Sequence, residues 1–367
     1  MIQREESRTL FLVPSAKPGG GNRVAFALAG MLARDQQVSV LYPAGSAPAA
    51  YDAGRADSAA VGIKAGGRIV QAINTLALFA RLILTRGRYD AVISTGPTMA
   101  PFLALVPGPQ VYNFVQADDY TLFDGHPALR SGLLNGLYRL SVLISNCYKN
   151  IGFIFNSGFS HARFLERSHR HGIPRLIVHP GLDHEVFHPG AGQGRDGTVR
   201  IGFMARPQPG KGLPDFMAAI GLMTEQLRNR IAVTVMALGP LDVPPPCLRW
   251  TVVRPGGDRA IASIMAGSDI FVSSSWREGF GLPAMEAMAC GCAVVTSDNG
   301  GCREYARHQA NCLMYPPGDS AQLARCIGRL VDDAGLRRRL SAGGIRTASA
   351  FTWQRSRGQL LRALGRA

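Results

Sequence analysis

Short apolar runs alternate along the chain with longer segments of helical periodicity. This alternation indicates parallel sheets made of strand–helix units, because a strand covered on both faces is apolar throughout. In the first half, strands are predicted at residues 9–13, 38–42, 91–94, 110–115, 152–155 and 176–179. In the second half, they are predicted at 199–204, 232–237, 250–253, 270–273, 293–296 and 312–315. The pattern therefore predicts an α/β protein with two doubly wound parallel sheets.

A Gly-rich polar stretch at residues 189–198 separates the two halves. It has no apolar period, so it is interpreted as a linker between two Rossmann-like domains, residues 1–189 and 198–351. A chain of 367 residues is long enough for two such domains. The remaining segment, 352–367, is predicted to form an amphipathic helix with Thr352 as its N-cap, and no strand is predicted next to it.

Composition and charge narrow the class of protein. The chain is 46% hydrophobic and 18% charged, which is typical of a globular protein. Its net charge of +15 would suit a nucleic-acid partner, but no helix-turn-helix, zinc-knuckle or RNP-like pattern is present. Among the 40 basic residues arginine greatly outnumbers lysine, so codon bias can supply much of the charge. An anionic lipid surface or a phosphate-bearing substrate is the favoured partner, and nucleic acid is not expected.

The cysteines and the apolar runs indicate the cellular compartment of the protein and whether it spans a membrane. The 7 cysteines are odd in number and form no C-x-x-C pair, which favours free thiols in a reducing, cytoplasmic compartment. Arg81 interrupts the longest apolar candidate, residues 74–84, so no spanning helix of about 20 residues is expected. The segment 68–88 is both basic and apolar, and it has two possible interpretations. It binds peripherally to the inner face of a membrane, or its apolar residues simply pack on the sheet.

The strongest chemical signal is the segment 273–286, which carries Glu278 and Glu286 around a Gly-Phe-Gly-Leu-Pro turn. Glu278 follows a predicted strand, and the glycines that come after it let the backbone approach a ligand closely. Pro283 then suits the first turn of a helix, whose free amides can receive a phosphate. The alternative is an ordinary strand–loop–helix in which the glutamates only complement the helix dipole.

A second signal opens the second half, where the predicted strand 199–204 leads to Arg206 and, in a Gly-rich loop, Lys211. Arginine offers a planar fork of donors and lysine a compact charge, so the two can hold a diphosphate. With these cations neutralising the phosphates, no metal is expected. The competing interpretation is a solvated basic loop.

A third element is the Gly-rich loop 17–23, which contains Gly20 and Gly21 and precedes a helix predicted to open at about Val24. Such loops also begin dinucleotide-binding units. Here the spacing is not G-x-G-x-x-G, and Tyr42 and Pro43 stand where an acidic residue would end the second strand. A nicotinamide cofactor is therefore not expected.

The segment 273–286 resembles the E-x7-E signature of retaining glycosyltransferases of family four, which have the GT-B fold, and the loop 206–212 resembles the family's R-x4-KG element. The resemblance implies two domains facing a central cleft, with the C-terminal helix crossing back to the first domain. It implies that Glu278 contacts hydroxyls of the donor sugar and that Glu286 binds the ribose. Backbone amides would hold sugar and diphosphate, and those residues are Gly279, Phe280, Gly281 and Leu282. Gly20 and Gly21 would face the donor phosphates from the opposite wall and meet the acceptor.

The chain departs from the family pattern after the fourth strand, where many members have a histidine and this chain reads FVQADDY at 114–120. That stretch is similar to rhamnosyltransferase-like members that build bacterial surface polysaccharides. The interpretation places Gln116 near the anomeric carbon and lets Asp118 or Asp119 accept the acceptor's proton. Aspartate pairs are also common helix caps, and that alternative stays open.

Together these features predict a hexosyl- or deoxyhexosyltransferase of polysaccharide biosynthesis. It would move a sugar from a nucleotide-diphosphate donor to a glycan, lipid-linked or small-molecule acceptor with retention of anomeric configuration and without a cofactor. Arg206 and Lys211 would stabilise the departing phosphate. Two alternatives remain: a sugar-nucleotide epimerase of similar architecture, and a basic binding protein without catalysis.

Overall fold

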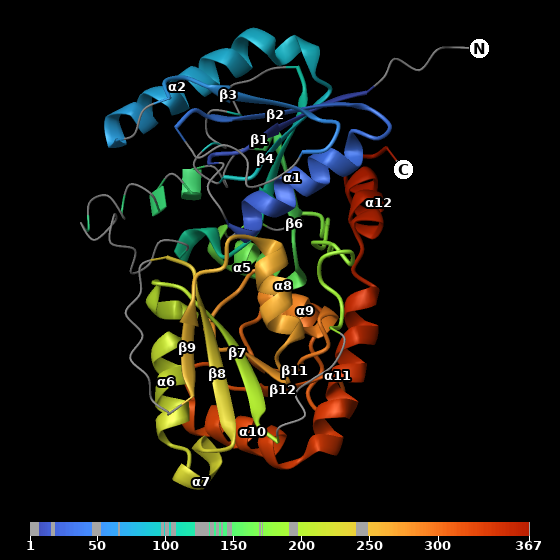
Figure 1. The fold of residues 1–367 in the computed structure, drawn as a ribbon. Coiled ribbons are helices and arrows are strands. Elements are labelled where there is room, and N and C mark those ends of the chain that lie inside the picture. The colour runs from blue at the N-terminus through green and yellow to red at the C-terminus, as the bar shows by residue number, and fades with distance from the viewer. Residues whose placement is uncertain are drawn as a thin grey trace. The chain divides into compact units, whose positions relative to one another are not determined.

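The computed structural model divides the chain into two compact units, and each is described by itself. Unit 1 comprises Met1–Gly181 and Trp353–Ala367, and unit 2 comprises Leu182–Thr352. Each unit holds one parallel sheet covered by helices (Figure 1). The structure describes residues 7–15, 19–45, 53–64, 67–96, 99, 103, 108–121, 132, 136, 139–140, 142–144, 149–168, 170, 172–190, 197–239 and 249–366.

The sheet of unit 1 has six parallel strands in the order β3-β2-β1-β4-β5-β6. This is the strand order of Rossmann folds, in which the chain reverses direction across the sheet between β1 and β4. Central strands such as β1 and β4 are mostly apolar and almost fully buried because both faces of the sheet are covered. The strands are β1 (Arg8–Leu12), β2 (Gln37–Pro43), β3 (Asp57–Val61), β4 (Ala91–Ser94), β5 (Gln110–Val115) and β6 (Ile151–Phe155).

Helices of unit 1 close an apolar core against this sheet. Leu10, Leu12 and Val92 of the strands and Leu78 and Leu82 of a helix are fully buried in one cluster. Short 3-10 turns follow at Arg86–Arg88 and Asp119–Thr121. The described helices are α1 (Gly20–Leu32), α2 (Arg68–Thr85), α5 (Gly158–Ser168) and α12 (Trp353–Ala363).

The sheet of unit 2 repeats this topology, with six parallel strands in the order β12-β11-β10-β7-β8-β9. The chain reverses direction across the sheet between β7 and β10, and the carboxyl ends of those two neighbours lie side by side. Ligands of doubly wound sheets bind at such a point. The strands are β7 (Val199–Ala205), β8 (Ile231–Ala237), β9 (Trp250–Val253), β10 (Ile270–Ser273), β11 (Ala293–Ser297) and β12 (Cys312–Tyr315).

Helices cover both faces of the second sheet (Figure 1). An apolar cluster lies between the sheet and the helices on each face. In the first cluster Phe203 of β7 stacks on Phe216 with ring centroids 4.2 Å apart. In the second, Met265 and Met288 pack beneath the sheet. The helices are α6 (Leu213–Gly221), α7 (Glu225–Arg228), α8 (Asp258–Ala266), α9 (Leu282–Ala289), α10 (Ser320–Asp332) and α11 (Ala334–Ser349), with 3-10 turns η5 (Pro209–Lys211) and η6 (Gly301–Glu304).

The C-terminal helix α12 returns to unit 1, as predicted. It packs against α1. The Arg366 guanidinium just beyond its end donates to Thr9 Oγ1 at 2.7 Å and to Gln36 Oε1 at 3.0 Å. Arg357 pairs with Asp35, and Gln359 accepts from the backbone N–H of His179 at 2.9 Å. These contacts tie the last residues of the chain to its first strand.

Two local predictions were wrong, and one strand was missed. Helix α1 begins at Gly20, not at Val24, because Arg23 N–H already donates to Gly19 O at 3.0 Å. Residues 176–179 form no strand. Ile177 makes an isolated bridge to Phe155, and prolines at 174 and 180 limit further pairing. Strand β3 was not foreseen, since its sequence DSAAV is mostly exposed and lacks an apolar run.

The division between the units lies at Gly181–Leu182, ahead of the linker expected at 189–198. Leu182 and Phe187 are buried in the second apolar cluster of unit 2, which explains why this segment goes with unit 2. Most of the expected linker, residues 191–196, lies outside the described part of the chain.

Candidate functional site

Two loops at the carboxyl edge of the second sheet form the centre of the candidate site. One follows β7 and contains Arg206 and Lys211, and the other follows β10 and contains Glu278. Because β7 and β10 are paired neighbours, both loops leave the sheet at the same place. The topology therefore brings together three side chains that are far apart in sequence.

Hydrogen bonds fasten these two loops to each other. Ser274 Oγ donates to Gly212 O at 2.7 Å, and Trp276 N–H donates to Gly210 O at 2.9 Å. Gly212 has φ +72°, and a Cβ there would lie 2.0 Å from Ser274 O. Only glycine fits this close approach in a left-handed conformation. Gly212 thus holds the neighbouring Lys211 against the second loop.

Lys211 and Glu278 form the ion pair of the site, with Nζ to Oε1 at 2.7 Å. Both side chains are largely buried. Burial by itself raises the pKa of Glu278, but the charges of Lys211 and Arg206 and hydrogen bonds from Lys211 and Ser275 oppose it, and the resulting pKa lies below the ordinary glutamate value. The carboxylate is therefore ionised at neutral pH.

A pocket of about 310 Å³ of open space, solvent included, lies over this ion pair. Two cations and one carboxylate face it from the two loops, and the floor is apolar. Lysine keeps further N–H donors after bonding to Glu278, and Arg206 adds a fork of donors. The arrangement can hold an anionic group next to a hydroxyl-rich one. The lining residues are Met204, Arg206, Lys211, Phe271, Val272, Ser273, Ser274, Ser275, Glu278 and Pro283.

The backbone of Glu278 is fixed by the segment that follows β11. Glu278 N–H donates to Asn299 O at 3.1 Å, and its carbonyl accepts from Gly301 N–H at 3.1 Å. A Cβ on Gly301 would lie 2.4 Å from Glu278 O, so this segment can approach only without a side chain. Sequence reasoning missed Asn299 and Gly301 because they contact the backbone of Glu278 from a third loop.

The turn Gly279–Leu282 leads into α9, as the sequence predicted. Gly281 precedes the helix with φ +89°, and its carbonyl accepts from Tyr305 Oη at 2.6 Å. Phe280 is 3% exposed and packs between Tyr305 and Phe351, so its side chain serves the core. Glu286 is 2% exposed on α9 and is not among the residues that line the pocket. The structure therefore brings Arg206, Lys211 and Glu278 together but leaves Glu286 apart from the open space.

In unit 1 the structure joins Gln116 to the Gly-rich turn. Gln116 Nε2 donates to Gly21 O at 3.1 Å, and Asn156 Nδ2 donates to Gln116 O at 2.7 Å. A Cβ on Gly21 would stand 3.3 Å from Gln116 Nε2, so the contact is tight. Gly20 and Gly21 form the first turn of α1. Lys17, in the same loop, lies outside the described residues.

The two neighbouring aspartates after β5 differ in their surroundings. Asp118 is buried, and its Oδ2 accepts from Arg163 Nε and Nη2, both at 3.1 Å. Asp119 is half-buried, and desolvation together with the charge of Asp118 raises its pKa to about 7. Both line a second pocket, of about 270 Å³ solvent included, with Tyr120, Arg163 and Arg167 among its walls.

The described residues contain neither a metal cluster nor a membrane-spanning helix. No three His, Cys, Asp or Glu side chains gather as a metal site would require. No helix there has the length and apolar character needed to cross a membrane. His161 packs on Phe155 with ring centroids 4.9 Å apart, while His169 and His171 lie outside the described part.

Comparison with known proteins defines the class. Anabaena Alr3699/HepE, solved in complex with UDP and glucose, has a TM-score of 0.74 at 19% identity and covers 98% of this chain and 100% of its own. Sucrose-phosphate synthase from Thermosynechococcus elongatus has a TM-score of 0.77 at 19% identity, with 98% and 99% covered. The fold is the GT-B fold of glycosyltransferases.

The match to a protein family lies within unit 2. Residues 198–333 match the family described as Glycosyl transferases group 1. A D-inositol 3-phosphate glycosyltransferase from Stackebrandtia nassauensis is 31% identical over 214 residues, covering 52% of this chain and 48% of that protein. The chain spans about half the length of the curated relatives it matches.

Gly212→Ala is expected to damage both stability and the site. The new Cβ would meet Ser274 O and would also force alanine into a left-handed conformation, at a cost of about 1–3 kcal/mol in the free energy of unfolding. Lys211 would then move away from Glu278. Thermal unfolding and donor binding would be measured beside Gly210→Ala, since a Cβ at Gly210 meets nothing within 4 Å. Equal behaviour of the two variants would show that Gly212 does not set the loop.

Proposed function

We propose that this protein is a retaining glycosyltransferase that moves a hexose or deoxyhexose from a nucleoside-diphosphate donor to a glycan, lipid-linked or small-molecule acceptor. The single observation that carries the proposal is the pocket in which Arg206 and Lys211 flank the ionised Glu278. Cations suit the diphosphate, and a carboxylate suits sugar hydroxyls. UDP is the proposed nucleotide, because a protein of similar fold was solved with UDP and glucose.

The chemical step breaks the bond between the anomeric carbon and the diphosphate oxygen, and negative charge grows on the leaving phosphate. Arg206 and Lys211 would stabilise that charge more than they stabilise the bound donor, which lowers the barrier. Glu278 would orient the sugar through its hydroxyls, and the amides of Gly279–Leu282 would support sugar and phosphate. The ribose contact assigned to Glu286 rests on family resemblance, since this side chain is buried.

Retention is proposed to come from attack of the acceptor on the face that the phosphate leaves. Gln116, held by Gly21 and Asn156, is the proposed polar neighbour of the anomeric centre. Asp118 accepts two hydrogen bonds from Arg163, and of the two aspartates Asp119 is the proposed proton acceptor because its pKa is raised. Its pKa of about 7 matches a base that works near neutral pH.

The proposed place of action is the cytoplasmic face of a membrane, where lipid-linked acceptors of surface polysaccharides are built. Two properties support it: the net charge of +15, which favours anionic lipid surfaces, and the basic, apolar segment 68–88. The likeness to rhamnosyltransferase-like members supports a role in polysaccharide assembly.

A panel of nucleotide sugars tests the function. A glycosyltransferase should release nucleoside diphosphate slowly from its own donor and faster with the correct acceptor, and NMR of the product should show the donor's anomeric configuration retained. A changed sugar without transfer would identify an epimerase. No turnover of any donor would favour a binding protein without catalysis.

Arg206→Ala and Lys211→Ala should each lower kcat by on the order of a hundredfold to a thousandfold, with a smaller change in KM. The reason is that both side chains act on charge that develops in the transition state. Their combined loss should be less than the product of the two, because they share one phosphate group. Steady-state kinetics with the donor found in the panel would measure this.

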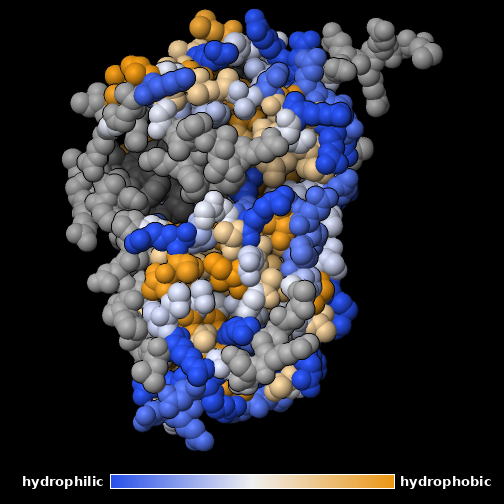
Figure 2. Space-filling model, in the orientation of Figure 1, coloured by the Kyte–Doolittle hydropathy of each residue, from blue (hydrophilic) through white to orange (hydrophobic). Residues whose placement is uncertain are grey.

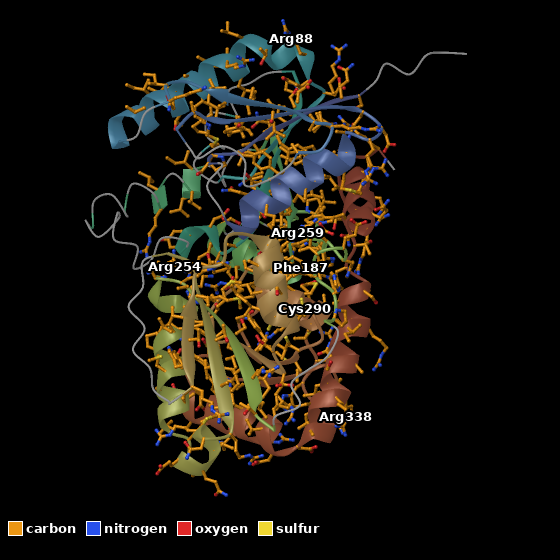
Figure 3. All side chains as sticks on the ribbon, viewed as in Figure 1. Arg88, Phe187, Arg254, Arg259, Cys290 and Arg338 are labelled. Carbon is orange, nitrogen blue, oxygen red and sulfur yellow. The ribbon has the colours of Figure 1, made fainter. Side chains whose placement is uncertain are left out.

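The control for these variants is Arg338→Ala, on α11 in the same unit (Figure 3). Arg338 is exposed and belongs to another pocket, so its loss should leave kcat unchanged. Arg303 is a poorer control, since it is bound to Asp298 by two contacts of 2.7 Å. Similar small losses in the clamp variants and in Arg338→Ala would mean that the basic loop is only a solvated surface.

If Asp119 accepts the proton, kcat/KM should rise as pH increases through about 7, because the carboxylate form takes over above that pKa. Asp119→Asn should lose this rise and be slower by about 10²–10⁴-fold. Asp118→Asn should shift the rise to lower pH, since it removes the negative charge that helps to raise the pKa of Asp119. An unchanged pH profile in Asp119→Asn would remove this residue from the mechanism.

A further inference from the structure

Helix α2 of unit 1 has two apolar faces instead of one. Its inner face packs on the sheet through Leu78, Phe79 and Leu82, and the fully buried Asn74 on this side donates to Ala44 O at 2.6 Å. This face supplies all the packing that a helix on a doubly wound sheet needs. Other apolar side chains of the helix must therefore be accounted for in another way.

The outer face of α2 carries large aliphatic side chains in contact with solvent. Leu84 is 85% exposed and Leu76 62% exposed, and Ile73 and Ile83 are about half exposed. At 3.6 residues per turn these four, with exposed Ala80 between them, fall within about 100° of arc on the side opposite the buried face. Packing on the sheet, one of the two interpretations of segment 68–88, therefore accounts for the inner face of the helix but not for these exposed side chains.

A fifth exposed aliphatic residue, Ile63, is bonded to the same helix. Ile63, after β3, is tied to α2 because its N–H donates to Asn74 Oδ1 at 2.7 Å and its carbonyl accepts from Asn74 Nδ2 at 2.9 Å. Ile63 is itself half exposed. The outer face of α2, meaning Ile73, Leu76, Ile83 and Leu84, is thus an apolar surface, and Ile63 adds a further exposed aliphatic side chain that is bonded to the helix through Asn74.

Charges of a single sign border this surface. Lys64, Arg81 and Arg88 are exposed around it, and no acidic residue occurs from 64 to 89. Figure 2 shows hydrophobic and strongly hydrophilic residues next to one another over α2, and Figure 3 labels Arg88 just past the end of the helix. An apolar stripe edged with cations is typical of a helix that lies in the boundary layer of an anionic bilayer.

We propose that the outer face of α2 is a membrane-docking surface that inserts its aliphatic side chains among anionic phospholipids, with Lys64, Arg81 and Arg88 at the level of the headgroups. A protein partner fits less well, because the described outer face has no aromatic residue to act as an anchor. The inference deepens the proposed peripheral location and rests on it. It needs neither the donor site nor the reaction, so lipid binding and transfer can be tested separately.

The test is flotation of the full chain with vesicles of phosphatidylcholine alone and of phosphatidylcholine mixed with phosphatidylglycerol, at low salt. The wild-type chain should bind the anionic vesicles at least about tenfold more than the neutral ones, and added salt should weaken that binding. Leu76→Glu/Leu84→Glu should reduce binding to anionic vesicles by about tenfold or more. The variant loses two leucines that would insert into the bilayer, and it gains two negative charges that the anionic lipids repel.

The matched control is Leu222→Glu, which changes an equally exposed leucine (63%) of unit 2 and should bind vesicles as the wild type does. The double variant should keep its melting temperature and its release of nucleotide from the donor, because both leucines are exposed. Absence of wild-type binding to anionic vesicles would overturn the proposal, as would equal losses in Leu222→Glu. It would also be overturned if the double variant only converted a dimer to a monomer in gel filtration, which would make a second copy the partner of this face.

Discussion

The ion pair between Lys211 and Glu278 is the contact on which the candidate site depends. It joins the loops after two neighbouring parallel strands, and it keeps Glu278 ionised in a largely buried place. Burial by itself would favour a neutral carboxyl group, and the charges of Lys211 and Arg206 oppose that effect. With the lysine, the pocket contains opposite charges at fixed positions before any ligand arrives, so little reorganisation is needed when a diphosphate binds.

Small residues make this contact possible from two directions. Gly212 lets the first loop reach Ser274, and Gly301 lets a third loop reach the backbone of Glu278. Tyr305 adds a hydrogen bond to Gly281 at the start of α9. The acidic side chain is thus held by its charge partner on one side and by its own backbone on the other. That dual support explains how a short loop can keep a precise geometry.

The sequence was sufficient to predict that Arg206, Lys211 and Glu278 meet, because each follows a strand and parallel strands end at one edge. The sequence did not show that the Phe280 side chain is buried, since its direction depends on how the turn before α9 packs on distant residues such as Phe351. Strand β3 was missed for a related reason: an edge strand needs few apolar residues. Patterns reveal what a segment buries, but tertiary packing decides which side chains remain accessible.

The path of the chain has a consequence for how such a protein can be divided. Unit 2 is an insertion within unit 1, since α12 returns to the first sheet after unit 2 is complete. The two ends of the insertion meet, with Leu182 N–H donating to Phe351 O at 3.0 Å and Leu182 bridging to Thr352. A segment with adjoining ends can be exchanged as a cassette at little cost in loop-closure entropy. Unit 2 could therefore be replaced during evolution while unit 1 kept its first strand and its last helix.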